Sequence, residues 1–387
     1  MKTADVVVIG GGVVGASVAW HLAARGCSDV LVLERAAKPG LGSTGRATGG
    51  FRAQFGSEVN VRLSLLAREK LLRFGDEVGA DPGYRPHGYL FLADRPETLE
   101  LLRALQATQR RAGLHEVRCV DAAEAREINP AVRDDGLLGG VFCPTDGFIR
   151  PLQILRGYAA GARRLGARFE HGAAVVGMRR DGDGRVAAVR TQRGEVAAGA
   201  VVDAAGAWAG EVARMAGVDV PVRPLRRQVA LTRPFAILPE EMPLTVFVDS
   251  GLQLRVRDGR VLLLWGDGPP TADPFDTTFD PGWLPTVLRH AHRDVPCLRE
   301  AGIDPEECWA GLYEMSPDRH ALLGRAPGVE NLFLANGSSG HGVMHSPALG
   351  HLLAEIILDG RATTLDVHAL RPERFAEGRP IEATEIL

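Results

Sequence analysis

The sequence predicts a mixed α/β (α+β) fold with two interleaved domains, one on a parallel sheet covered by helices and one on a mostly antiparallel sheet. Two observations lead to this prediction. A strand-helix-strand unit opens the chain and a buried strand followed by a helix closes it, whereas β-rich stretches with alternating apolar residues lie between them. Because the strands of parallel type are not contiguous in sequence, we expect the chain to cross between the domains several times.

The opening unit consists of two buried strands joined by a helix. The run from Asp5 to Ile9 is rich in β-branched residues, as in a strand that is covered on both faces. Residues 13–24 then place apolar side chains at helical spacing, and Gly26 ends the helix. The second apolar run, "DVLVLE" over residues 29–34, completes the β-α-β unit.

Helices and short strands alternate through the rest of the chain. Two helices are expected over residues 58–78 and 96–112, with the strand "GYLFLA" between them. Short apolar runs over residues 169–202 are broken by "DGDG" and "QRGE", which are typical of hairpin turns. Residues 226–267 alternate in the manner of an antiparallel sheet, and "NLFLAN" followed by "SPALGHLLAEIIL" reads as a final buried strand and helix.

These patterns divide the chain into five segments. We assign three of them to the parallel-sheet domain: residues 1–85, 146–222 and 322–387. The other two form the second domain: residues 86–145 and 223–321. If each domain were one continuous stretch of sequence, the first glycine-rich turn and a similar turn near the C-terminus would lie in different domains.

Composition excludes several classes of function. Lysine plus arginine number 45 and aspartate plus glutamate number 48, so no basic surplus points to nucleic acid. The five cysteines are scattered without a CxxC pair, which indicates reduced thiols, a cytoplasmic protein and no metal site. Glycines interrupt the apolar N-terminus, and no apolar run approaches the roughly twenty residues of a membrane span.

The motif "GGGVVG" follows the first strand and opens the first helix. Gly10, Gly12 and Gly15 give the GxGxxG pattern, which lets the backbone approach a pyrophosphate at a helix N-terminus. Glu34 ends the second strand, where a carboxylate accepts hydrogen bonds from ribose hydroxyls. A glycine-rich turn without a ligand is the alternative, but it leaves Glu34 unexplained. FAD and NAD share this fingerprint, so the motif does not choose between them.

Two further glycine-rich segments bear on that choice. "LGSTGRATGGFRAQFG", Leu41 to Gly56, is either a segment that lies along a cofactor or a flexible surface loop. "NGSSGHGVMHSPALG", Asn336 to Gly350, brackets His341 with two glycines just before the last helix. Backbone N–H groups at such a helix start can stabilise negative charge on a ligand.

With "GGGVVG", "ERAAKPGLGSTGRATGG", "VVDAAGAWAG", "AGLYEMSPDRHALLG" and "NGSSGHGVMHSPALG" in this order, the chain resembles the D-amino-acid-oxidase-like FAD oxidoreductases. It is most similar to the branch that holds sarcosine oxidase β subunits, L-proline dehydrogenase β subunits, glycine oxidase and dimethylglycine dehydrogenase. The resemblance implies a Rossmann-like FAD-binding domain and a substrate-binding domain. It implies that the second glycine turn serves the isoalloxazine end of the same extended cofactor.

The resemblance also implies which residues contact FAD. They are Gly10, Gly12, Val13, Val14, Gly15, Glu34, Arg35, Gly42, Ser43, Thr44, Arg46, Ala47, Thr48, Gly49, Val175, Ala205, Gly206, Trp208, Gly311, Gly340, His341, Gly342, Val343 and Met344. His341 is otherwise an ordinary histidine at a helix start.

The implied reaction removes a hydride from the carbon beside an amine nitrogen, passes it to flavin N5, and gives an imine that water hydrolyses. The implied substrate is a secondary or N-methyl amino acid of the sarcosine, proline or glycine type. Arg52 matches an arginine that binds the substrate carboxylate, although a salt bridge or phosphate contact also suits it. Tyr313 matches a pocket tyrosine and is otherwise a packing residue, and His341 and Met344 complete the predicted catalytic set.

Departures from the family pattern refine these expectations. Met344 stands where similar oxidases have a carboxylate-binding lysine, and Gly311 and Gly45-Arg46 stand where relatives tether FAD through cysteine or histidine. We therefore expect FAD to be non-covalent. The stretch "VLLLWGD" contains no lysine to promote reaction with oxygen, which favours a dehydrogenase that passes electrons to a partner subunit or carrier over an oxidase.

Two other functions stay open at this point. One is a flavin-bearing subunit or assembly factor of a hetero-oligomer, with little turnover of its own. The other is an NAD-dependent dehydrogenase, which is disfavoured because the C-terminal glycine turn would then have no role.

Overall fold

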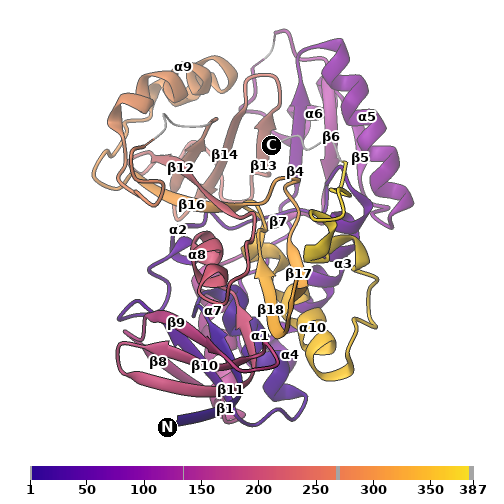
Figure 1. Cartoon of the computed structure of the whole chain (residues 1–387). Coiled ribbons are helices and arrows are strands. Elements are labelled where there is room, and N and C mark those ends of the chain that lie inside the picture. Colours follow the sequence, from indigo (N-terminus) through magenta and orange to yellow (C-terminus); the bar gives the residue numbers. More distant parts are fainter. Residues whose placement is uncertain (1, 134, 267–270, 383–387) are drawn as a thin grey trace.

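A computed structural model of the chain describes residues 2–133, 135–266 and 271–382. Within this part the strands form two eight-stranded sheets and one small two-stranded sheet. Figure 1 shows the two large sheets as the two halves of the molecule, with the first sheet in the lower half. The mixed α/β fold that the sequence predicts is confirmed.

The first sheet is parallel across its centre and draws its strands from three separate regions of the chain. Its order is β17 (Leu322–Ala326), β18 (Val329–Asn336), β11 (Gly194–Asp203), β1 (Lys2–Ile9), β2 (Val30–Glu34) and β8 (Arg168–His171). β17 runs antiparallel to β18, and the hairpin of β9 (Val175–Arg180) and β10 (Val186–Thr191) extends from β11. The opening strand, which is predicted over Asp5 to Ile9, begins earlier, at Lys2. The predicted hairpin turns are confirmed.

Helices cover one face of the first sheet and explain why its strands are continuously apolar. α1 (Val13–Ala24) packs against α10 (Gly342–Asp359) and α7 (Pro151–Arg164), and α10 packs against α3 (Glu58–Leu72). Alternate residues of β1 and β2 enter the core beneath these helices, while the residues between them enter a second core beneath α8 (Ala209–Arg214). Because both faces are buried, nearly every side chain of the two strands is apolar.

The contact between α1 and α10 is unusually close. Ser17 Oγ donates a hydrogen bond to the carbonyl oxygen of Ser346 at 2.7 Å. A Cβ atom at Gly350 would lie 2.2 Å from Ser17 Oγ, so a side chain at this position would force the helices apart.

The second sheet is antiparallel at every junction but one. Its order is β16 (Trp309–Met315), β12 (Arg223–Leu231), β15 (Arg260–Leu264), β14 (Leu252–Arg257), β13 (Leu244–Phe247), β4 (Tyr89–Ala93), β6 (Gly139–Cys143) and β5 (Arg118–Asp121). The exception is β13 with β4, which pair in parallel; they come from distant parts of the chain, so no hairpin turn requires them to be antiparallel. The prediction of a mostly antiparallel sheet is confirmed for the described residues, which exclude 267–270.

The remaining elements are short or cover the second sheet. They are α2 (Ser43–Arg46), α4 (Phe74–Val78), α5 (Pro96–Arg111), α6 (Ala122–Ile128), α9 (Leu284–Asp294), β3 (Gly50–Phe51) and β7 (Gly147–Phe148). Short 3-10 helices span Gly206–Trp208, Pro281–Trp283, Pro296–Glu300, His368–Leu370 and Pro372–Arg374. The single helix predicted over residues 58–78 is wrong in one respect, since the helix breaks at Arg73 between α3 and α4.

The strands of each sheet come from the segments that the sequence assigned to each domain, and the domain boundaries themselves stay a prediction. Among the described residues, no helix combines the length and the apolar character that crossing a bilayer requires.

We predict that Gly350→Ala destabilises the protein, because the added methyl group enters the closest part of the α1–α10 contact. Overpacking of this kind costs about 1–3 kcal/mol of unfolding free energy, measurable as a lower midpoint in urea or heat. The matched control is Gly75→Ala in α4, where an added Cβ meets open space. Equal midpoints for the two variants would contradict the argument.

Candidate functional site

A cavity of about 520 Å³ lies between the two large sheets and is lined by residues of both. The first sheet contributes the carboxyl ends of β1, β2 and β11, which is where parallel sheets bind ligands. The second sheet contributes residues of β12, β15 and β16. The volume is within the usual range for a pocket that binds a cofactor or small molecule.

The N-terminus of α1 faces one end of the cavity. Gly10 has φ +109°, and a Cβ there would lie 2.4 Å from the carbonyl oxygen of Ala204, so only glycine fits this turn. Val13 N donates to Thr44 Oγ1 at 3.1 Å, whereas the N–H groups of Val14 and Gly15 have no hydrogen-bond partner among the described residues. Donors at the start of a helix favour a negatively charged ligand such as a pyrophosphate.

Glu34 is fixed at the wall of the cavity by the backbone. Its Oε2 accepts from Gly11 N at 2.8 Å, and its Oε1 accepts from Ala36 N at 2.7 Å. Each oxygen keeps a second lone pair that can accept a hydroxyl hydrogen. This geometry suits the ribose contact that the sequence predicts.

The segment of residues 43–49, which contains α2, is tied to the second sheet. Ser43 Oγ donates to the carbonyl of Leu312 at 2.8 Å, and Arg46 Nη1 donates to that of Ala310 at 2.6 Å, both on β16. From β14, Arg255 Nη1 donates at 2.9 Å to two carbonyl oxygens of the same segment. The segment is therefore an anchored wall of the cavity and not a free surface loop.

The N-terminus of α10 faces the other end. Gly340 has φ +96°, and a Cβ there would lie 2.4 Å from the ring of Tyr313, so the turn needs glycine to lie against this ring. The N–H groups of Gly342, Val343 and Met344 have no hydrogen-bond partner among the described residues. The two glycine-rich turns thus place two helix N-termini at one elongated cavity.

The wall of the cavity contains every predicted cofactor residue except Gly15 and His341. Gly15 lies behind the wall, where a Cβ would be 2.0 Å from the carbonyl oxygen of Gly10, so it serves the packing of α1 on β1. Of the predicted catalytic set, Tyr313 and Met344 line the cavity, whereas Arg52 and His341 do not.

Arg52 and His341 instead contact each other inside the protein. Arg52 is 5% exposed and donates from Nη1 to the carbonyl of Gln54 at 2.6 Å and from Nη2 to His341 Nε2 at 3.2 Å. Its guanidinium lies over the ring of Phe55, 4.1 Å from the centroid. Because Nε2 accepts this bond, His341 is neutral; burial and then the charge of Arg52 lower the pKa of His341 well below its usual value.

Another arginine lines the cavity near Tyr313. Arg227 lies on β12, with its guanidinium carbon 5.5 Å from the centroid of the Tyr313 ring. Val229 and Leu264 add apolar side chains to the wall beside it. In the sequence Arg227 lies at the start of the stretch 226–267 that is predicted to form the antiparallel sheet, and nothing in its local pattern shows which way its side chain points.

A stacked group at the cavity wall was not predicted as a unit. Trp208 stacks on Phe275 with 5.2 Å between the ring centroids and 13° between the ring planes, and Arg35 lies 3.6 Å from the centroid of Trp208. The loop that carries Phe275 is bound to β12, where Arg226 Nη1 donates to the carbonyl of Thr278 at 2.9 Å. No local signal in the sequence marks Phe275 as a neighbour of Trp208.

One buried and one half-buried carboxyl group lie beneath the α10 turn. Asp203 ends β11 and is fully buried; burial, together with the charge of Glu314, raises its pKa to about 8. Burial also raises the pKa of Glu314 to about 7, although Glu314 accepts from Ser338 N at 3.3 Å. Among the described residues, no group of histidine, cysteine and acidic side chains could hold a metal ion.

We predict that Asp203 makes the stability of the FAD-free protein depend on pH. Its pKa rises from 3.8 to about 8 on folding, so the folded state retains a proton that the unfolded state releases over this interval. The contribution of this retained proton to the free energy of unfolding is full below the ordinary pKa of aspartate and is lost as the pH rises towards 8. The unfolding midpoint of Asp203→Asn should therefore rise relative to that of the wild type as the pH increases from 4 to 8. The exposed Asp219→Asn serves as control, and parallel curves for all three proteins would contradict the assignment.

Comparison with known proteins identifies the family. The family model described as FAD dependent oxidoreductase matches residues 5–356. The solved structure of L-proline dehydrogenase from P. horikoshii is 30% identical, with a TM-score of 0.90 over 98% of this chain and 100% of that chain. Glycine oxidase from Geobacillus kaustophilus is 27% identical, with a TM-score of 0.84 over 97% of this chain and 99% of that chain.

Curated relatives include two human mitochondrial enzymes. Dimethylglycine dehydrogenase of Homo sapiens is 31% identical over 99% of this chain and 45% of its own length. Sarcosine dehydrogenase of Homo sapiens is 31% identical over 97% of this chain and 42% of its own length. The chain thus spans about half the length of these curated relatives.

The cavity fits the cofactor of this family. Its two helix N-termini and the carboxylate of Glu34 suit a dinucleotide, and the cradle at Gly10 and Gly340 leaves no room for a side chain. No cysteine or histidine side chain lines its described wall, so neither of the two tethers known from similar proteins is available there. The chain belongs to the FAD dependent oxidoreductase family, and its cofactor is non-covalently bound FAD.

Proposed function

We propose that the protein oxidises a secondary or N-methyl amino acid at the carbon beside its nitrogen, and that water then hydrolyses the imine product. The observation that carries this proposal is the end of the cavity at the α10 turn. There Arg227 and Tyr313 meet the apolar side chains of Val229, Leu264 and Met344. A cation beside an apolar wall is the arrangement that a small amino acid requires.

When bound, FAD supplies the acceptor for the hydride that leaves the substrate. The chain supplies the environment for that reaction. The N–H groups of Gly342, Val343 and Met344 at the start of α10 stabilise negative charge, because they lie at the positive end of the helix dipole. The apolar wall excludes water, and a substrate bound as the neutral amine needs no side-chain base.

We propose Arg227 as the residue that binds the substrate carboxylate. Its guanidinium borders the cavity, whereas that of Arg52 lies behind the wall and donates to Gln54 and His341. In this assignment Arg52 supports Met344, whose sulfur accepts a hydrogen bond from Arg52 N at 3.4 Å. Tyr313 lies between the carboxylate site and the glycine turn and orients the substrate.

A dehydrogenase is favoured over an oxidase. The chain has three lysines, Lys2, Lys38 and Lys70, and none of them lines the described wall of the cavity. No lysine is therefore present there to promote reaction with oxygen, and we propose a partner subunit or soluble carrier as the electron acceptor. The five free cysteines are consistent with a reducing cytoplasmic location.

We predict that anaerobic addition of the right amino acid bleaches the flavin absorbance. The panel consists of sarcosine, dimethylglycine, L-proline and glycine, and each is matched by the corresponding amine without a carboxylate. Bleaching by an acid but not by its matched amine supports the proposal. If dithionite reduces the flavin and a broad amine panel does not, the protein is instead a flavin-bearing subunit or assembly factor with little turnover.

Substitution of the two arginines that are candidates for binding the substrate carboxylate should have different effects. Arg227→Gln should weaken binding of the substrate, or of a carboxylate inhibitor that perturbs the flavin spectrum, by about 2–5 kcal/mol while FAD stays bound. Arg52→Lys should have a smaller effect. Arg223→Gln is the control, because Arg223 is on the same strand, is exposed and does not line the described wall of the cavity. Loss of ligand binding in Arg52→Lys but not in Arg227→Gln would return the role to Arg52.

A further inference from the structure

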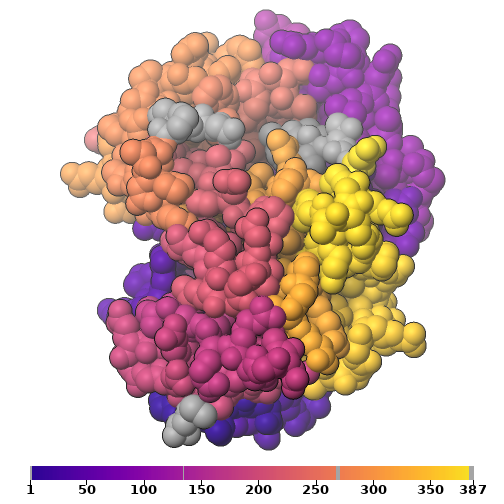
Figure 2. All heavy atoms as spheres, in the orientation of Figure 1, coloured from indigo at the N-terminus to yellow at the C-terminus, as the bar shows by residue number. Residues whose placement is uncertain are grey.

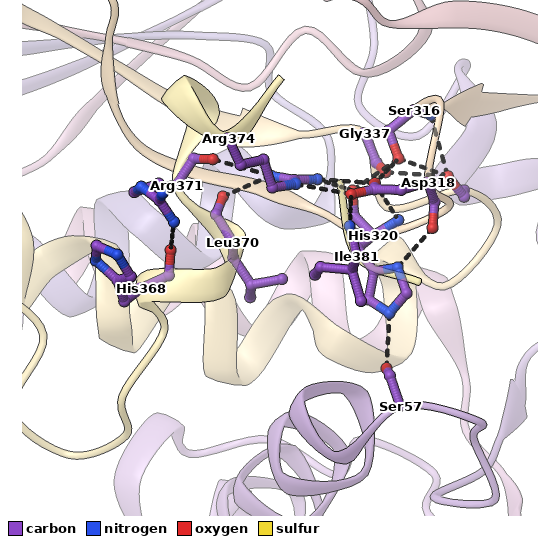
Figure 3. Close-up of polar contacts among 11 residues, drawn as sticks. Ser57, Ser316, Asp318, His320, Gly337, His368, Leu370, Arg371, Arg374 and Ile381 are labelled. Atoms are coloured by element: carbon purple, nitrogen blue, oxygen red, sulfur yellow. Dashed lines mark hydrogen bonds and ion pairs between the residues drawn. The ribbon is translucent and has the colours of Figure 1, made fainter. Parts of the chain in front are cut away.

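A buried arginine near the C-terminus contacts the loop that joins the two large sheets. Arg374 is fully buried and lies beyond residue 356, where the family match ends. Its Nε and Nη2 donate to the two carboxylate oxygens of Asp318 at 2.8 and 2.9 Å, and Nη2 also donates to the carbonyl of His320 at 3.0 Å. Nη1 donates to the carbonyls of Leu370 and Arg371 at 2.9 and 3.1 Å. All five N–H donors of the guanidinium are therefore used (Figure 3).

Asp318 connects this arginine to a second part of the C-terminal segment. Its Oδ2 also accepts from Ile381 N at 3.0 Å. Burial raises the pKa of Asp318, but the hydrogen bonds from Arg374 and from backbone N–H groups outweigh this effect, so the net pKa is below its usual value. Figure 2 shows the C-terminal segment, in yellow, on the surface where the two halves of the molecule meet. A buried pair of this kind is costly to break from one side only.

The network continues from Asp318 and His320 to the cofactor-facing turn. Ser316 Oγ donates to the carbonyl of His320 at 2.7 Å, and Ser316 N donates to Ser339 Oγ at 3.1 Å. Ser339 has φ +50°, which is uncommon for a residue with a side chain, and its N–H donates to the carbonyl of Glu314 at 3.0 Å. Since Gly340 follows immediately, these contacts fix the backbone of the turn at the cavity.

A second branch reaches the segment that carries Arg52. His320 Nδ1 donates to the carbonyl of Asp318 at 2.6 Å, and its Nε2 accepts from Ser57 Oγ at 2.6 Å (Figure 3). Ser57 caps α3, since its Oγ accepts from Asn60 N. The loop of Asp318 thus braces the chain on two sides of the predicted substrate end of the cavity.

We infer that Arg374 is a positioning residue for FAD: it holds the loop of Asp318, which through Ser316 and Ser339 sets the backbone of the α10 turn. The C-terminal segment is then part of the cofactor site although it lines no part of the cavity. The inference depends on the FAD site and not on the identity of the substrate, so the failure of either proposal is distinguishable from the failure of the other.

The test compares the affinity of the FAD-free protein for FAD, by quenching of flavin fluorescence, across matched variants. Arg374→Lys retains the charge but cannot make the paired contacts with Asp318. We expect it to raise the dissociation constant of FAD about tenfold or more and to shift the visible spectrum of the bound flavin. Arg371→Gln is the local control, because Arg371 is an arginine of the same segment that pairs with Glu377 at the surface. Val287→Ala, in the core of the second sheet, controls for a general loss of stability.

A double-mutant cycle separates positioning from stability. Ser339→Ala removes the acceptor of the Ser316 hydrogen bond, so it should reproduce the effect of Arg374→Lys on FAD binding and on the flavin spectrum. If the two residues act along one route, the double variant binds FAD no more weakly than the weaker single variant. The inference would be overturned if the effects of the two substitutions on the dissociation constant of FAD multiply in the double variant. It would also be overturned if Arg374→Lys has a lower thermal midpoint but an unchanged FAD affinity and flavin spectrum. Ser339→Ala keeps the test decisive even if Arg374→Lys does not fold.

Discussion

The close approach of α1 to α10 is the constraint on which the rest of the structure depends. The helices belong to opposite ends of the chain, yet the hydroxyl of Ser17 bonds to the backbone of α10 and a glycine, Gly350, takes the place where a side chain would collide. This contact places two helix N-termini at one cavity. FAD, which carries negative charge on its central pyrophosphate and electron-rich atoms on its isoalloxazine, can then interact with both helix dipoles at once.

The interleaved course of the chain follows from that arrangement. The parallel sheet supplies the floor for FAD, and the antiparallel sheet supplies β12, β15 and β16 at the opposite wall. The segment of residues 43–49 joins the two, since Arg255 and the carbonyl groups of β16 bind it from the second sheet. The cavity is thus shaped by both sheets, and neither one encloses it alone.

Buried charges in this protein are distinguished by what they contact. Arg374 uses all its donors within the protein, and Arg52 is committed to a carbonyl oxygen and a neutral histidine. Arg227 differs in bordering the cavity beside Tyr313. The position of an arginine at the cavity or behind its wall is thus the observation on which the proposed role of Arg227 rests.

The sequence by itself determined the fold class and the family, and all but two of the cofactor residues that it predicts line the cavity. Period-two and period-3.6 apolar patterns depend only on local geometry, and glycines at Gly10 and Gly340 mark backbone conformations that few other residues adopt. The tertiary structure decided which polar side chains face the cavity. Arg52 and Arg227 both lie in segments near the site, and their local patterns are compatible with either direction. In the tertiary structure Phe55 and His341 contact Arg52, whereas Arg227 borders the cavity. Only these contacts distinguish the two arginines. The roles of Phe275 and Arg374 likewise depend on contacts between segments distant in sequence, which no local pattern records.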